Sequence, residues 1–109
     1  MTYVIDMPGA FVTYWTGTGV AQGQEWSSVP EEEAGARELR AAFDNCETLK
    51  RGFGFTHRLT LRSREAVVVL CEYAETCVSI NESVGSDERE YAELRAARKI
   101  IGQCEAALR

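Results

Sequence analysis

The pattern that most restricts the fold of this chain lies in its second half, where two stretches carry apolar side chains at helical spacing. The first stretch, residues 64–80, follows Ser63, a residue that can cap a helix. The second stretch, residues 94–108, has apolar side chains alternately three and four positions apart. Gly85 breaks the pattern between them, and Ser86 or Asp87 can begin the next helix. These features predict an antiparallel pair of helices at the C-terminus.

Several segments before residue 63 predict strands. Residues 55–62 alternate apolar and polar side chains, as a half-buried strand does. Residues 3–5 and 11–16 are rich in β-branched and aromatic side chains, and the Pro-Gly turn between them favours a β-hairpin at the N-terminus. Residues 23–26 suit a short additional strand. We therefore expect a small, mainly antiparallel sheet built from the N-terminal hairpin and strand 55–62.

A further helix is expected over residues 30–48. Ser28 and Glu31 have the spacing of a capping box, and the three glutamates after Pro30 favour the positive end of a helix dipole. Strands and helices are mixed without a repeated strand–helix–strand rhythm, which is typical of the α+β class. The sequence therefore predicts one α+β domain spanning residues 1–109, with three helices packed against the sheet.

The composition agrees with a folded domain and excludes several classes of protein. The chain has 109 residues, of which 45% are hydrophobic, and a formal net charge of −5. No apolar run approaches the ~18 residues of a transmembrane helix, and the N-terminus lacks the pattern of a secretory signal. We therefore expect a cytoplasmic protein without a membrane partner. Arginine outnumbers lysine ten to two, which is typical of a high-GC genome and favours a bacterial or phage source.

The sequence offers little support for catalysis or metal binding. Cys46, Cys71, Cys77 and Cys104 have no pair at the close spacing of a zinc site, so no metal and no other cofactor are expected. In a reducing cytoplasm they are expected to be free thiols in the core. His57 is the only histidine, and a cysteine brought beside it in space would make a Cys-His enzyme the third functional class to consider. No enzymatic activity is expected.

A basic, aromatic segment at residues 50–64 indicates an alternative function. Its five residues Arg-Gly-Phe-Gly-Phe, beginning at Arg51, resemble the aromatic strand motif of RNA-recognition-motif domains. The resemblance implies that Phe53 and Phe55 stack on bases while Arg51 contacts phosphate. The element order expected here departs from that family, which has a strand between its first helix and this motif. The candidate contacts to single-stranded RNA or DNA are Lys50, Arg51, Phe53, Arg58, Arg62 and Arg64.

The sequence favours a small, non-enzymatic module that binds another protein, in the manner of a phage or mobile-element accessory protein. Residues 11–16, interpreted as a strand, carry aromatic side chains on both faces, and the apolar stripe of helix 63–82 is wider than one core contact needs. Surplus apolar surface on a small domain often marks an interface. The expected partner is a host protein or a second copy, most simply as a homodimer through the helical hairpin. The candidate interface residues are Tyr14, Trp15, Val69, Tyr73 and Ile80.

Overall fold

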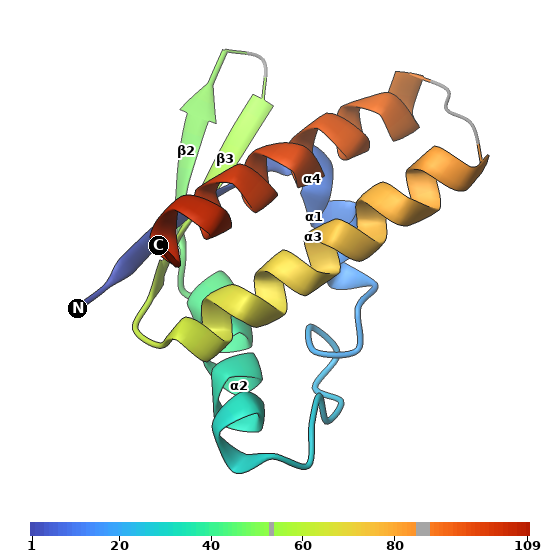
Figure 1. Cartoon of the computed structure of the whole chain (residues 1–109). Coiled ribbons are helices and arrows are strands. Elements are labelled where there is room, and N and C mark those ends of the chain that lie inside the picture. Colours follow the sequence, from blue (N-terminus) through green and yellow to red (C-terminus); the bar gives the residue numbers. More distant parts are fainter. Residues whose placement is uncertain (53, 85–87) are drawn as a thin grey trace.

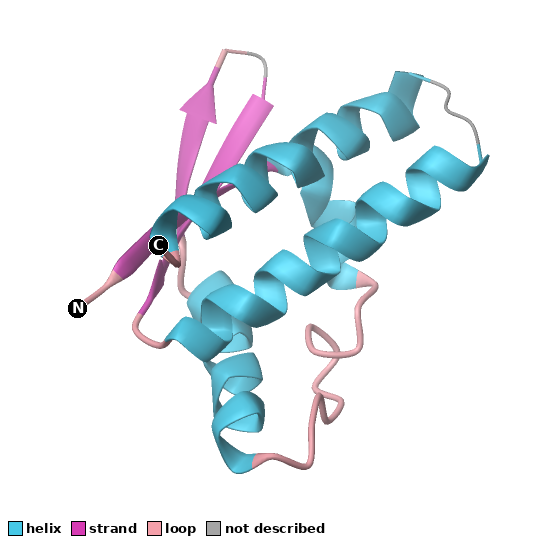
Figure 2. Ribbon diagram, viewed as in Figure 1, coloured by secondary structure: helices cyan, strands magenta, loops and turns pink. Residues whose placement is uncertain are grey.

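The computed structural model describes residues 1–52, 54–84 and 88–109 of the chain and confirms the α+β class. A three-stranded antiparallel sheet lies on one side of the molecule, and the helices cover it from the other side (Figures 1 and 2). The expected capping residues Ser86 and Asp87, together with Gly85, fall outside the described residues. The elements in chain order are β1 (Tyr3–Pro8), α1 (Gly9–Thr16), α2 (Pro30–Asp44), β2 (Glu47–Arg51), β3 (Gly54–Leu61), α3 (Arg64–Val84) and α4 (Glu88–Ala107).

The sheet has the strand order β1-β3-β2, so the strand with the clearest alternation, β3, is central. Directly opposite residues of an antiparallel pair share a face, and Ile5 on β1 pairs with Leu59 on β3. Ile5, Met7, Leu59 and Leu61 are fully buried on the face that the helices cover. The alternating pattern of residues 55–62 therefore predicted the strand. It also predicted which face of the strand is buried, as Leu59 and Leu61 in its C-terminal half show.

The prediction of a second strand in an N-terminal hairpin is wrong, because residues 9–16 form helix α1. Phe11 and Trp15 stand four positions apart, so a helix brings both rings to one face, where they are buried to 0% and 1% exposure. Burial of two large aromatic side chains outweighs the strand preference of this segment. Residues 23–26 form a turn and an irregular segment, so the additional strand expected there is absent.

Strand β3 instead forms a hairpin with β2, in a stretch where the sequence predicted the end of a helix. Helix α2 stops at Asp44, and Glu47–Arg51 pairs antiparallel with Gly54–Arg58. The turn contains Gly52 with φ +60°, a conformation that glycine adopts without a steric penalty. The segment after α2 therefore forms an edge strand paired with β3.

The starts of α2 and α3 differ in whether the capping residue predicted from the sequence caps the helix. Ser63 caps α3 as expected, because its hydroxyl accepts a hydrogen bond from the Ala66 N–H at 3.2 Å. Ser28 does not cap α2. The Glu33 carboxylate reaches back and accepts hydrogen bonds from the N–H groups of Trp26 at 2.7 Å and Ser27 at 3.0 Å. These backbone hydrogen bonds lower the pKa of Glu33 and tie the loop before α2 to the helix.

Helix α3 is the central helix of the fold. It packs against α4 along its length and against α2 at its beginning, where Gly35 allows the α2 backbone to approach Glu65 and Ala66. The predicted antiparallel pair of C-terminal helices is therefore confirmed (Figure 1). The wide apolar stripe of α3 has its explanation here, since the chain's own helices cover most of it.

Candidate functional site

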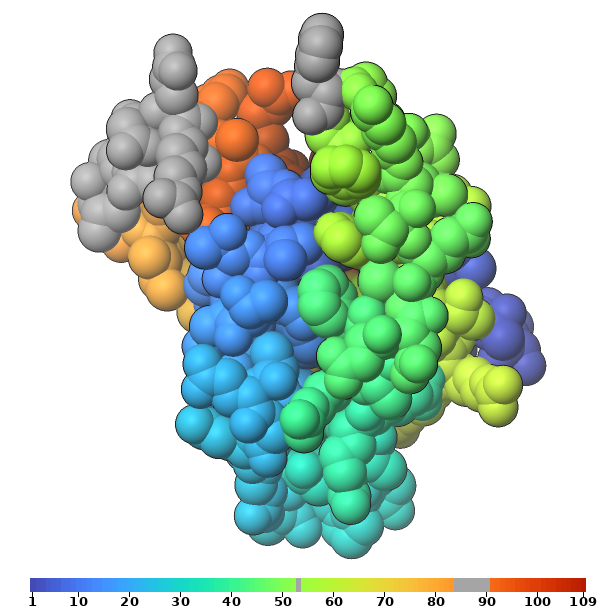
Figure 3. Space-filling view, turned by 180° about the vertical axis from the view of Figure 1, so that it is seen from behind, coloured from blue at the N-terminus to red at the C-terminus, as the bar shows by residue number. Residues whose placement is uncertain are grey.

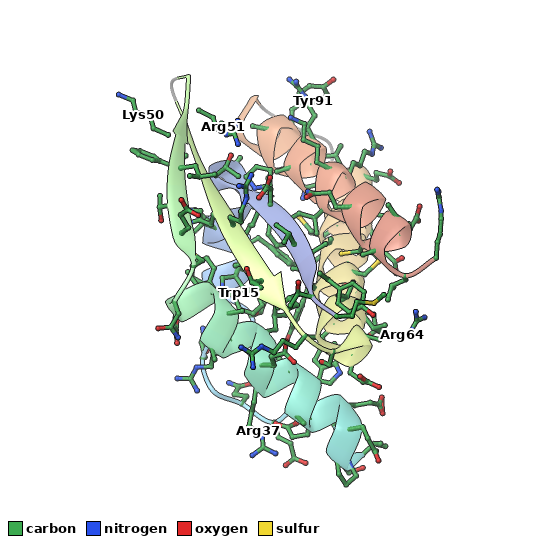
Figure 4. The ribbon with its side chains drawn as sticks, turned by 90° about the vertical axis from the view of Figure 1, so that its left-hand side faces the viewer. Trp15, Arg37, Lys50, Arg51, Arg64 and Tyr91 are labelled. Atoms are coloured by element: carbon green, nitrogen blue, oxygen red, sulfur yellow. The ribbon has the colours of Figure 1, made fainter. Side chains whose placement is uncertain are left out.

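The structure buries two of the five sequence-predicted interface residues in the core. Trp15 and Val69 are 1% and 2% exposed and belong to the core. The Tyr73 hydroxyl accepts a hydrogen bond from the Val20 N–H at 3.2 Å, and its ring packs on Trp26 with centroids 5.0 Å apart. Figure 4 shows Trp15 between the sheet and the helices. Trp15 and Val69 are therefore not accessible to a partner, whereas Tyr73 is half-buried and packs within the monomer.

The remaining two predicted interface residues are less buried than Trp15 and Val69. Tyr14 is half-buried, and its pKa is raised by burial and by the nearby Cys77, Tyr73 and Glu93. Ile80 is 49% exposed. The five residues therefore do not make one continuous exposed surface.

The basic segment is divided between the two ends of a strand. Lys50 and Arg51 lie at the end of β2 near the turn, whereas Arg64 lies beyond the opposite end of β3 (Figure 4). Arg62 directly follows that end of β3. Eight residues of β3 span about 25 Å, so these groups cannot contact the same few nucleotides. Phe53 falls outside the described residues.

Arg58 lies between the two ends and is neutralised on the outer face of the sheet. Its guanidinium binds Asp6 with Nε–Oδ1 at 2.9 Å and Nη2–Oδ2 at 3.3 Å. The register places Asp6 directly opposite it on β1 and Glu47 directly opposite it on β2. Asp6, with a smaller contribution from Glu47, raises the pKa of Arg58. Carboxylates on both sides leave Arg58 poorly placed to contact a phosphate.

An exposed aromatic side chain does remain beside Lys50 and Arg51. Phe55 is 54% exposed and pairs directly with Lys50 across the hairpin. It lines a groove of about 570 Å³ between the β2–β3 hairpin and the start of α1, together with Val12, Arg51 and His57. Figure 3 shows α1 and the hairpin lying next to each other on this face. This groove is the part of the motif resemblance that the geometry retains.

The structure also brings one cysteine next to the histidine. Cys46 Sγ lies 3.7 Å from His57 Nδ1, and the Thr48 hydroxyl lies 3.4 Å from the same nitrogen. The other three thiols are buried among the helices. Burial raises the pKa of Cys71 to about 11 and those of Cys77 and Cys104 to about 12. Within the described ranges, no three His, Cys, Asp or Glu side chains come together as a metal site.

The feature that distinguishes this surface is the difference between the two edges of the sheet. At the β1 edge, the Gln103 side chain of α4 donates to the Asp6 C=O and accepts from the Asp6 N–H, both at 2.8 Å. This amide takes the place of a neighbouring strand. At the β2 edge, the described part of the chain contributes no backbone or side-chain partner to the outward-facing peptide groups. β2 lies at the margin of the molecule in Figure 4.

The outward-facing groups of β2 follow from the hydrogen bonds of Asp6. Because Asp6 directs its peptide groups to Gln103, its partner Arg58 directs its own toward β2 and forms a hydrogen-bonded pair with Glu47. Pair types alternate along an antiparallel ladder. Thr48 and Lys50 therefore point their N–H and C=O groups away from β3 to the open edge.

The sequence interpretation missed both features that decide this contrast, the strand β2 and the side chain of Gln103. The segment Glu47–Arg51 has one apolar side chain, Leu49, and so shows no alternation. The one local signal was the glycine at position 52, which suits a hairpin turn. Gln103 could not have been found by pattern, because its contact with Asp6 joins residues 97 positions apart.

Comparison with known proteins finds no matching family model, no matching curated protein and no matching solved structure. Among the helices that the structure describes, none is both long and apolar enough to cross a membrane. The functional conclusion therefore depends on the geometry of the sheet edge.

Proposed function

We propose that this protein is a non-enzymatic interaction module that binds an extended segment of a partner as an additional strand at β2. The open β2 edge carries this proposal, because at the β1 edge of the same sheet Gln103 occupies the outward-facing peptide groups of Asp6. An open edge offers a row of peptide groups that pairs with another strand. Strand addition of this kind gives affinity through main-chain hydrogen bonds and specificity through alternate side chains.

The side chains of β2 restrict which strand can bind. Glu47, Leu49 and Arg51 share the outer face, whereas Thr48 and Lys50 share the inner face. A partner with an acidic residue opposite Arg51 is favoured, and one with a basic residue there is disfavoured. The free thiols in the described structure support a reducing, cytoplasmic location for the module. The composition supports a phage or mobile-element origin.

A random-peptide display selection on the immobilised protein tests the proposal. We expect the selected peptides to bind the wild-type protein and to lose binding to Lys50→Pro, which removes an outward-facing N–H group. The matched control is Arg62→Glu, which alters an exposed residue just beyond β3 and should bind as the wild type does. Selected peptides that bind Lys50→Pro as tightly as the wild type would show that the β2 edge is not the binding site.

A second candidate function, binding of single-stranded RNA or DNA, is favoured by the exposure of Phe55 beside Lys50 and Arg51. An exposed aromatic ring flanked by cations is the arrangement on which bases stack. With two cations available, log K should fall with log salt at a slope of about −1.4. Anisotropy of a labelled oligonucleotide should detect weaker binding for Phe55→Ala. Val4→Ala is the control, since Val4 is also 54% exposed but lies on the opposite face of the sheet.

A further inference from the structure

We infer that the strand which the open edge accepts is β2 of a second copy of this chain, paired antiparallel about a two-fold axis at Leu49. This inference rests on the proposed function and names its partner. The two sheets would join into one, with the order β1-β3-β2 continued by β2-β3-β1 of the second copy. A two-fold interface requires a self-complementary surface, and β2 satisfies this requirement in its backbone and in its charges.

The backbone selects the register. Thr48 and Lys50 are the residues of β2 whose peptide groups face outward, as derived above from Asp6 and Gln103. With the axis at Leu49, Thr48 lies opposite Lys50 of the second copy, and Lys50 lies opposite Thr48. Both pairs are then of the hydrogen-bonded type, in which each residue exchanges its N–H and C=O bonds with its partner. An axis at Thr48 or Lys50 would leave one of these two residues without such a pair.

The same register pairs opposite charges. Glu47 falls opposite Arg51 of the second copy, Arg51 falls opposite Glu47, and Leu49 meets Leu49. These are non-hydrogen-bonded pairs, whose side chains approach most closely. Within the part of the chain that the structure describes, neither Glu47 nor Arg51 forms an ion pair of its own. The second copy supplies each of them with an oppositely charged partner.

The pairing also continues a row of alternating charges that the monomer begins. Asp6, Arg58 and Glu47 lie side by side across β1, β3 and β2 on the outer face. Arg58 forms two hydrogen bonds with Asp6. Glu47 lies at the end of the row, and its neighbour Arg58 is already paired with Asp6. Arg51 of the second copy would extend the row with the next positive charge.

The length of β2 sets the expected affinity. A pairing of two five-residue strands buries much less than the ~1,200 Å² of a standard interface. The dimer should therefore be weak and dynamic, with a Kd of about 10 µM to 1 mM. Concentration consequently decides how much of the protein is paired, which suits an edge that also binds other extended segments.

Sedimentation velocity over a concentration series up to about 1 mM tests the inference, using the full chain and charge-reversed variants. Glu47→Arg alone and Arg51→Glu alone place like charges opposite each other, and each should stay monomeric. An equimolar mixture of the two variants places opposite charges at both positions and should dimerise at least as well as the wild type. Arg62→Glu makes the same charge change away from the edge and should dimerise like the wild type.

Two further measurements keep the result decisive. Circular dichroism shows whether each variant folds, and Lys50→Pro supplies a monomeric control without any change at Glu47 or Arg51. Hydrogen exchange should slow at the Thr48 and Lys50 amides as concentration rises. A wild type that remains monomeric at about 1 mM, or an Arg51→Glu variant that dimerises as well as the wild type, overturns the inference. If display-selected peptides still require the β2 edge in that case, strand addition stands and self-pairing alone is wrong; if they do not, both are wrong.

Discussion

The two edge strands of this sheet are nearly equal in length but are treated in opposite ways. β1 has six residues and β2 has five. The outward peptide groups of Asp6 on β1 are occupied by the Gln103 amide, which α4 holds against the edge. Those of Thr48 and Lys50 on β2 face away from the protein. The fold thus occupies the outward groups of Asp6 on one edge and leaves those of β2 open, which supports β2 as the proposed binding edge.

The strongest way to break this comparison is a proline scan along β2. Leu49→Pro removes an N–H that bonds to β3 and should lower the free energy of unfolding by about 2–4 kcal/mol. Lys50→Pro removes an N–H that faces outward and should cost less than about 1 kcal/mol. Urea unfolding of both variants measures the difference. Equal losses at the two adjacent positions would show that the outward-facing groups of β2 have been assigned to the wrong residues.

The next prediction removes the cover from the β1 edge. Gln103→Met keeps a side chain of similar length but loses both hydrogen bonds to Asp6, so the unfolding free energy should fall by about 1–3 kcal/mol. Gln22→Met, at an exposed position outside the sheet, should change it by less than about 0.5 kcal/mol. The Asp6 amide should also exchange its hydrogen faster in Gln103→Met. Unchanged stability and exchange in that variant would mean that water serves this edge as well as the amide does.

How well the sequence predicted these elements follows from where each element gets its stability. The long helices α3 and α4 and the central strand β3 bury one face over many residues, so their periodicity was readable. α1 was misread because Phe11 and Trp15 are strand-favouring residues held in a helix by burial. The candidate site depends on strand order, which no local pattern in Glu47–Arg51 specifies. Edge strands bury little, and so they leave little trace in a sequence.

The cysteines next to the two edges allow a chemical comparison. Cys46 directly precedes β2 and is half-buried beside His57, whereas Cys104 follows Gln103 on α4 and is fully buried. Burial, together with the adjacent Cys71, raises the pKa of Cys104 to about 12, so at pH 8 only about one in 10,000 of these groups is a thiolate. Iodoacetamide should label Cys46 at least about tenfold faster than Cys104, as measured by mass spectrometry of the native protein.

The sign of the pH dependence follows from the same raised pKa. An unfolded chain ionises its thiols above about pH 8.5, while the folded chain keeps Cys104 protonated to about pH 12. The folded state therefore binds more protons in this window, and stability should fall as the pH rises through it.

In the labelling experiment, Cys46→Ser should remove the fast labelling phase and leave the slow ones. Uniform labelling of the four thiols would contradict the difference in burial.

The smallest expected effect concerns the charge row that connects the two edges. The Asp6–Arg58 pair is 33% and 37% exposed, so a double-mutant cycle with alanine should give a coupling of about 0.5–1 kcal/mol. The Glu82–Arg98 pair is 55% and 57% exposed and should give about 0–0.5 kcal/mol. Asp6→Ala also frees Arg58 to pair with Glu47 in the same copy. It then competes with Arg51 of the second copy, so self-association should weaken about two- to threefold in sedimentation. Unchanged self-association in Asp6→Ala would mean that Glu47 is not shared between Arg58 and the second copy.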